Sequence, residues 1–197
     1  MRTRCTILLA TVLVAVSPLV AHAQSAQRLS VQGSGLLLNL MGDSFEGTDA
    51  GYGFEAQVRF TPSAFSFGVG LQYTSHGVEG LDDRATLIGG FFEPRYVFST
   101  SSESLFPYLS GRFYAVRFSN ENTVAQIKTT STGIAANGGG GVLVRLGSRM
   151  NADLGATFGY FRFGEFTFEN LATGIEGTGE GNNGSNLVVR LGLTFGL

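Results

Sequence analysis

The sequence is short of several things that soluble domains usually have. It has no tryptophan, one cysteine and four prolines in 197 residues, and only 14% of its residues are charged, against about a quarter in a typical soluble domain. No run beyond the N-terminal segment approaches the roughly 20 apolar residues of a membrane-spanning helix. Glycine (29) and phenylalanine (17) are abundant. This composition favours a strand-rich fold, as a buried soluble β-protein or as a membrane β-barrel.

The N-terminal segment has the pattern of a secretory signal peptide. Two early arginines precede an apolar stretch at 6–20, and an Ala-x-Ala sequence ends at Ala23. We therefore predict a cleaved signal peptide at 1–23 and one mature domain at 24–197. The alternative, an uncleaved anchor, is disfavoured because the apolar stretch is short. Since Cys5 is removed with the leader, the exported domain has no disulfide.

The rest of the chain divides into eight segments in which apolar and polar residues alternate. Alternation with a period of two predicts strands rather than helices. Most segments have 11–15 residues, which is long enough to cross a bilayer at a tilt. The predicted segments are 28–40, 51–61, 65–76, 85–98, 105–118, 132–146, 150–163 and 186–197.

The connections between these segments alternate in length. Those at 41–50, 77–84, 120–130 and 169–183 are long, whereas those at 62–64, 99–104 and 147–149 are short. Long outer loops and tight periplasmic turns are typical of an up-and-down outer-membrane barrel. The prediction is an all-β fold, an eight-stranded antiparallel transmembrane β-barrel with both chain ends on the periplasmic side.

The apolar faces could point outward into lipid or, in a lipocalin-like soluble barrel, inward. Aromatic residues near both segment ends favour the lipid-facing orientation, because two aromatic girdles flank the apolar band of a membrane barrel. One predicted belt comprises Phe60, Phe65, Tyr96, Phe98, Phe106, Tyr108 and Phe195, and the other Tyr52, Phe54, Tyr73, Phe118, Tyr160 and Phe166. The first segment changes phase between Val31 and Leu36, which predicts a β-bulge at Gly33-Ser34-Gly35.

With this orientation, charged residues point into the barrel. They are Glu55, Arg59, Glu93, Arg95, Arg112, Arg145, Asp153 and Arg190. Buried charges are tolerated when they are paired, and arginine pairs with carboxylates in a bidentate geometry. We predict an interior ion-pair network, with Gln57, Gln72 and Asn137 beside it, that plugs the barrel. Two surplus arginines leave open a narrow, mildly anion-favouring conduit.

The sequence shows no convincing catalytic or metal-binding constellation. His76 has Ser75, Asp82 and Asp83 nearby, but a single histidine at a loop edge is a weak basis for catalysis. Asp82 and Asp83 with Glu79 lack the spacing of a cation-binding loop. We predict no catalytic residues, no metal and no cofactor. The run Gly138–Gly141 is no phosphate loop, and we expect it to make room for aromatic neighbours.

The predicted long loops are acidic. Their acids are Asp43, Glu46, Asp49, Glu79, Asp82, Asp83, Glu121, Glu169, Glu176 and Glu180, against only Arg84 and Lys128. Acidic loops keep a surface soluble, and they can also contact divalent cations around lipopolysaccharide or a basic extracellular partner. Nothing in the composition indicates a nucleic-acid partner.

The final residues, Arg190-x-Gly192-x-x-Phe195-x-Leu197, resemble the C-terminal assembly signal of outer-membrane barrels. The stretches Phe106–Gly111 and Gly139–Asp153 are similar to strands of the small porin-like outer-membrane β-barrel family, which includes OmpA-type transmembrane domains. Many family members end in Phe, whereas this chain ends in Leu. The resemblance implies recognition by the barrel-assembly machinery. It implies no tether to the cell wall, since no peptidoglycan-binding domain follows.

Together these features predict a monomeric barrel in the outer membrane of a Gram-negative bacterium, embedded in lipid and lipopolysaccharide. The expected role is structural or surface interaction through the acidic loops. A narrow porin-like channel for small solutes or ions is the alternative, and a lipid-modifying enzyme is a third possibility.

Overall fold

The computed structural model describes residues 28–42, 45–79 and 81–197. The predicted signal peptide, 1–23, lies outside the described residues. Nine strands occupy most of the described chain: β1 (Leu29–Met41), β2 (Gly51–Phe60), β3 (Phe65–Val78), β4 (Leu81–Val97), β5 (Leu105–Asn122), β6 (Ile127–Arg145), β7 (Met150–Asn170), β8 (Ile175–Gly179) and β9 (Asn183–Gly196). No helix in the described part of the chain is long and apolar enough to cross a membrane.

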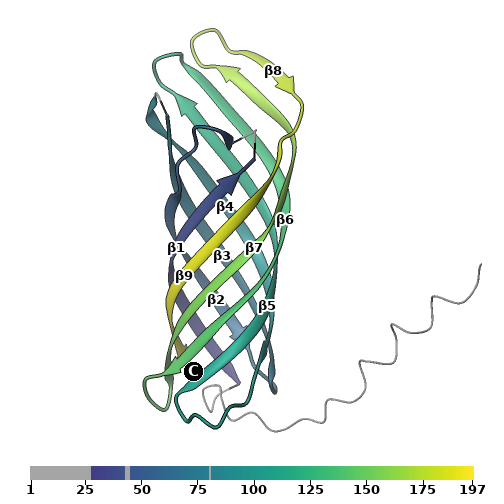
Figure 1. Ribbon diagram of the computed structural model, residues 1–197. Helices are drawn as coiled ribbons and strands as arrows, with labels where there is room; N and C mark the ends of the chain where they lie inside the picture. Colours follow the sequence, from purple (N-terminus) through teal and green to yellow (C-terminus); the bar gives the residue numbers. More distant parts are fainter. Residues whose placement is uncertain (1–27, 43–44, 80) are drawn as a thin grey trace, which may run out of the picture.

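Eight of the described strands close into an antiparallel barrel, as predicted. Each of β1 to β6 pairs with the next strand in the chain, and β9 closes the ring between β7 and β1. Figure 1 shows the tilted strands of this cylinder. The short β8 pairs only with β7, so it lies outside the ring.

The two ends of the barrel differ. The short connections 61–64, 98–104 and 146–149 lie at one end, here called the turn end, where the chain also finishes (Figure 1). The backbone amide of Leu197 there donates to the carbonyl of Leu29 at 2.9 Å. The opposite end is called the loop end. An up-and-down barrel with an even number of strands brings both chain ends to the same side.

At the loop end, strands replace much of the predicted loops. The β5–β6 ladder continues to the pair Asn122↔Ile127, and β8 lies inside the predicted loop 169–183. Similarly, β3 and β4 extend to Val78 and Leu81. The loop prediction was wrong here because it rested on the polarity of these stretches. Their β-branched residues nevertheless favour strands.

The predicted bulge at Gly33-Ser34-Gly35 is also wrong. β1 keeps an unbroken register through these residues with both β2 and β9. Leu36, Leu38 and Leu40 are buried on the same inward face as Ser30 and Gln32. The apparent phase change arises because the barrel interior itself becomes apolar toward the loop end.

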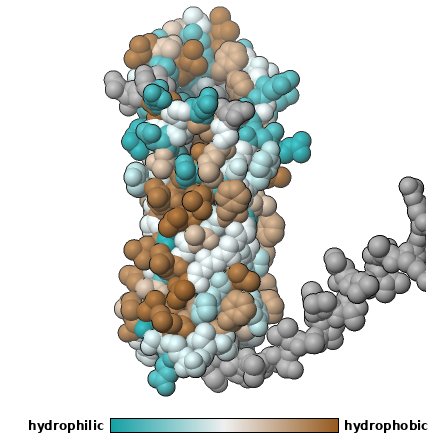
Figure 2. All heavy atoms as spheres, in the orientation of Figure 1, coloured by the Kyte–Doolittle hydropathy of each residue, from teal (hydrophilic) through white to brown (hydrophobic). Residues whose placement is uncertain are grey.

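The wall of the barrel is apolar outside and charged inside. On β3, Val69 is 64% and Leu71 69% exposed, whereas the interior side chains Glu93 and Arg112 are fully buried. Figure 2 shows hydrophobic residues gathered over the middle and lower wall, with hydrophilic residues concentrated above them. A soluble barrel has the reverse distribution, so the lipocalin-like orientation is excluded. An apolar outer wall around a polar interior is the distribution of a transmembrane barrel.

The predicted aromatic belts are correct only in part. Most of their members are exposed or half-buried on the outer wall, including Phe60 and Phe65 toward the turn end and Tyr52 and Tyr160 toward the loop end. Four members face inward instead. Phe106 and Tyr108 are buried inside the barrel, and Phe118 and Phe166 line a pocket at the loop end.

Candidate functional site: the barrel interior

Seven of the eight predicted interior charges meet in one cluster, here called the ion-pair cluster. It consists of Glu55 and Arg59 from β2, Glu93 and Arg95 from β4, Arg112 from β5, Asp153 from β7 and Arg190 from β9. Each side chain stands on the inward face of its strand and is almost completely buried. The strand period of two therefore delivers charges from five strands to one level of a closed cylinder.

Glu93 is the centre of this cluster, because four arginines contact its carboxylate. Nη2 of Arg59 lies 3.0 Å and Nη2 of Arg95 2.8 Å from Oε1. Nη1 of Arg190 lies 2.7 Å from Oε2. Nε of Arg112 is 2.7 Å from the same oxygen, at an angle that makes an ion pair without a hydrogen bond.

Two further carboxylates distribute the remaining positive charge. Asp153 accepts from Arg95 at 2.9 Å, from Gln32 at 2.8 Å and from the hydroxyl of Tyr108 at 2.6 Å. Glu55 accepts from Nη2 of Arg112 at 2.6 Å. The seven charged residues carry one excess positive charge, and pairing of this kind is what makes buried charges tolerable.

Arg145 is the predicted residue that the structure places elsewhere. It lies on the inward phase of β6 but is paired in register with Asn151, closer to the turn end than Asp153. Its guanidinium carbon is 4.8 Å from the ring centroid of Phe106, and the side chain is only partly buried. Sequence phase gave the correct direction for Arg145 but not its depth along the tilted strand.

The predicted polar neighbours are also buried inside, at different levels. Gln57 accepts from Nη2 of Arg59 at 2.9 Å. Asn137 and Asn186 exchange side-chain hydrogen bonds of 2.5 and 3.2 Å. Gln72 is buried on the inward face of β3.

Tyr108 is a member of the cluster that sequence reasoning assigned to the lipid-facing belt. Its hydroxyl donates to Asp153 and accepts from Nη2 of Arg190 at 3.0 Å. The signal was present, since Tyr108 has the same strand parity as Arg112. Glycine makes the necessary space, because a Cβ at Gly141 or Gly155 would collide with this hydroxyl. The predicted use of the glycine run, room for an aromatic neighbour, holds at Gly141.

An aromatic column, unforeseen from the sequence, leads from the cluster toward the loop end. It starts at Phe91, whose centroid is 4.0 Å from the guanidinium carbon of Arg112. Tyr114 follows at 6.0 Å, then Phe161 at 6.5 Å and Phe163 at 5.6 Å between centroids. The inward leucines of β1 pack in the same buried apolar group.

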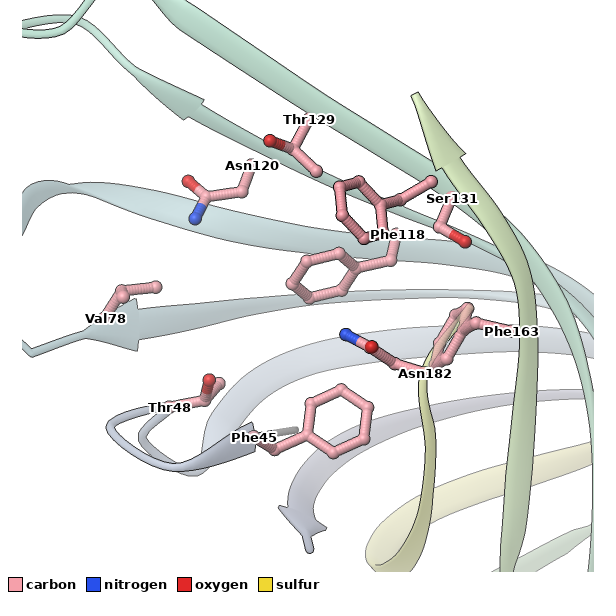
Figure 3. A pocket seen from close by; sticks show the side chains of 10 residues that line it. Phe45, Thr48, Val78, Phe118, Asn120, Thr129, Ser131, Phe163 and Asn182 are labelled. Carbon is pink, nitrogen blue, oxygen red and sulfur yellow. The ribbon is translucent and has the colours of Figure 1, made fainter. Parts of the chain in front are cut away.

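The column ends in a pocket of about 230 Å³ at the loop end, here called the mouth pocket. Its aromatic walls are Phe45, Phe118, Phe163 and Phe166. Figure 3 shows the first three of these rings around one space, with the side chains of Asn120 and Asn182 beside them. Thr48, Val78, Thr129 and Ser131 complete the lining.

His76 is buried near the loop end in a structural setting. Its Nε2 lies 3.0 Å from the hydroxyl of Thr74 and its Nδ1 3.1 Å from the carbonyl of Asp49. The neighbouring Ser75 points to the opposite face of β3, where it accepts from Nε of Arg84 at 2.7 Å. The structure therefore does not assemble a Ser-His-Asp arrangement from Ser75 and His76. The described residues also hold no group of three or more His, Cys, Asp and Glu side chains suited to a metal ion.

The residues of the C-terminal signal alternate across the wall of β9. Arg190 and Gly192 face the interior, and Gly192 packs so closely on Ser34 that a Cβ would collide with its hydroxyl. Phe195 and Leu197 are exposed on the outer wall.

Comparison with known proteins supports this architecture at the level of the fold. No family model and no curated protein matches the sequence. Among solved structures, Neisserial surface protein A is similar with a TM-score of 0.65 and 16% identity, over 86% of this chain and 97% of that one. OprG from Pseudomonas aeruginosa gives a TM-score of 0.55 and 13% identity, over 87% and 96%. The N-terminal barrel domain of Pseudomonas aeruginosa OprF gives 0.49 and 16%, over 87% and 97%. On the first two likenesses and its own topology, the chain has the eight-stranded barrel fold of the small outer-membrane proteins.

Proposed function

We propose that this protein is a monomeric integral protein of the Gram-negative outer membrane, with the turn end in the periplasm and the loop end outside the cell. The exposed apolar wall supports a lipid environment, because such a surface is unfavourable in water. Phe195 and Leu197 stand on the outer wall of the closing strand, where the barrel-assembly machinery could read the C-terminal signal. The same wall would contact membrane lipid and lipopolysaccharide.

The preferred role is structural or surface-interacting, with an interior closed by ion pairs. The observation that carries this proposal is the position of Glu93, whose carboxylate joins arginines from β2, β4, β5 and β9. Opening a pore at this level would break several buried ion pairs at once, which is costly in a low dielectric. The aromatic column adds a second barrier toward the loop end.

The loop end supports a surface role through its charge. Its described acidic side chains include Glu46, Asp49, Glu79, Asp83, Glu121, Glu169, Glu176 and Glu180, which are mostly exposed. Asp43 lies outside the described residues, as does the side chain of Asp82. This acidic rim suits divalent cations bridging to lipopolysaccharide, or a basic extracellular partner. Replacing Glu169, Glu176 and Glu180 by Gln should weaken such binding on whole cells while leaving the barrel folded.

We propose that the protein has no enzymatic role. A lipid-modifying activity would need a reactive constellation at the membrane level, and Ser75 and His76 lie on opposite faces of their strand. Mass spectrometry of lipid A from cells with and without the protein should show identical species.

The competing function is a narrow channel, favoured by the one excess positive charge of the ion-pair cluster. Conductance in planar lipid bilayers tests the two functions directly. The proposal expects no steady current from the purified protein at moderate voltage, and a current from a Glu93→Ala, Arg190→Ala double variant. A Glu176→Ala, Glu180→Ala variant is the matched control and should stay silent. A steady, anion-selective current from the unmodified protein would establish the channel instead.

A further inference from the structure

We propose that the mouth pocket is a binding site for a small neutral aromatic molecule that carries one hydroxyl or N–H group. This inference is independent of the role proposed above. It starts from the aromatic walls of the pocket. The ring centroid of Phe163 is 6.1 Å from that of Phe45, with an interplanar angle of 61°, and 6.2 Å from that of Phe118, with an interplanar angle of 66°. Aromatic rings favour such edge-to-face and tilted contacts, and a bound ring can extend the same arrangement.

The lining excludes charged ligands. All ten residues around the pocket are apolar or neutral, even though the loop end around it is rich in carboxylates. An anion entering an aromatic-walled pocket would lose its hydration and find no countercharge. A cation would be attracted to the ring faces, but that attraction is smaller than the cost of removing an unpaired charge from water. The site therefore selects neutral molecules.

The size of the pocket limits the ligand to about one ring. Its volume is about 230 Å³. An apolar cavity of about 150 Å³ in another protein is known to bind benzene, and sites for drug-sized ligands have about 300–1,000 Å³. A substituted single ring fits this range, whereas a phospholipid or a lipid A molecule is too large to be enclosed.

One polar atom in the pocket is the reason why the ligand should carry a hydrogen-bond donor. Oδ1 of Asn120 is buried, and it forms no hydrogen bond with any described residue. A buried acceptor without a partner is unfavourable. A hydroxyl or N–H group on the ligand would satisfy it while the ring packs against Phe118 and Phe163, which line the same pocket (Figure 3).

The pocket is closed on the side of the membrane interior. Phe163 forms its floor and stacks on Phe161 of the aromatic column, below which the ion-pair cluster fills the barrel. A ligand would therefore enter and leave from the loop end. The geometry is that of a binding site and not of a passage.

The test uses the complete mature protein in phospholipid nanodiscs, with NMR signals of the Asn120 amide and the Thr129 and Val78 methyl groups as local reporters. Benzyl alcohol is the neutral probe with a donor, toluene the neutral probe without one, and benzoate and benzylamine are the charged probes. Empty nanodiscs correct for partitioning of each probe into lipid. We expect saturable shifts with benzyl alcohol, binding of toluene about tenfold weaker, as the loss of one hydrogen bond predicts, and no saturation with either charged probe.

Two variants make the test specific. Asn120→Leu should reduce the affinity for benzyl alcohol to that for toluene, and Thr129→Trp should fill the pocket and abolish both. Asn39→Leu, on the exposed outer wall, is the control that should change neither. The proposal is overturned if the shifts do not saturate, if charged probes bind equally well, or if Asn120→Leu binds benzyl alcohol as the unmodified protein does.

Discussion

The guanidinium of Arg112 is held between a carboxylate and an aromatic ring. Its Nη2 donates to Glu55 at 2.6 Å, and its central carbon lies 4.0 Å from the centroid of Phe91. A desolvated cation over an aromatic face contributes on the order of 2 kcal/mol. Arg112 therefore joins the two halves of the interior, the ion-pair cluster and the aromatic column.

The central carboxylate of the cluster should be essential for the stability of the barrel. We expect Glu93→Gln to lower the free energy of unfolding by about 3–5 kcal/mol, because it leaves four buried arginines without their shared countercharge. Urea titration of the protein folded into phospholipid vesicles measures this change. Glu180→Gln, at an exposed position of the loop end, is the matched control and should change stability by less than about 0.5 kcal/mol. Equal stabilities of the two variants would contradict the assigned role of Glu93.

The space for Tyr108 should depend on one glycine within the run on β6. We expect Gly141→Ala to destabilise the barrel by about 1–3 kcal/mol, since its methyl group would collide with the Tyr108 hydroxyl and with the backbone of β7. Gly138→Ala lies in the same run, and a Cβ there meets nothing within 4 Å. It should therefore be nearly neutral in the same urea titration. A pair of variants with equal stability would show that the run serves another purpose.

At the loop end, Asp83 should titrate below the ordinary range of an aspartate. The backbone amide of Thr123 (2.6 Å) and then its hydroxyl (2.8 Å) donate to Oδ2 and lower the pKa of the carboxyl group. Because the pKa is lower in the folded state, the contact contributes its full stabilisation of the folded protein at pH values above the unfolded pKa, about 3.9. That stabilisation disappears as the pH falls through the folded pKa.

Removing one of the two donors tests this explanation. Thr123→Val should raise the pKa of Asp83 part of the way, since the backbone amide remains. A ¹³C NMR titration of the carboxyl group measures the shift, and Thr178→Val on β8 should leave the pKa of Asp83 unchanged. A titration curve unaffected by Thr123→Val would mean that the hydroxyl does not contribute.

The fold could be predicted from the sequence because the two barrel faces differ over most of the strands. On β3, Phe65, Phe67 and Val69 alternate with Ser66 and Gly68, so the period of two matches the change between lipid and barrel interior. From this match the strand, its orientation and its place in a closed barrel could be predicted. Inward charges such as Glu93 and Arg95 were placed by the same alternation.

The alternation loses its information where both faces are apolar. Leu36, Leu38 and Leu40 lie inside the barrel, yet the outward Leu37 beside them is equally apolar. Equating apolar with lipid-facing therefore produced a false bulge, and it assigned Phe118 to a girdle instead of the mouth pocket. Contacts between segments distant in the chain, such as Phe45 in the β1–β2 connection with Phe163 on β7, leave no local pattern.

The claim on which the account rests is that side chains of β3 alternate between lipid and a closed interior. Single-cysteine variants Phe65→Cys, Ser66→Cys and Phe67→Cys test it at three successive residues, because the one native cysteine, Cys5, lies in the predicted signal peptide. Phe65 and Phe67 are 53% and 41% exposed, whereas Ser66 is fully buried beside Arg59. A lipid-soluble pyrene maleimide added to protein in bilayers should label positions 65 and 67 and spare position 66. Labelling of position 66 alone would contradict the account.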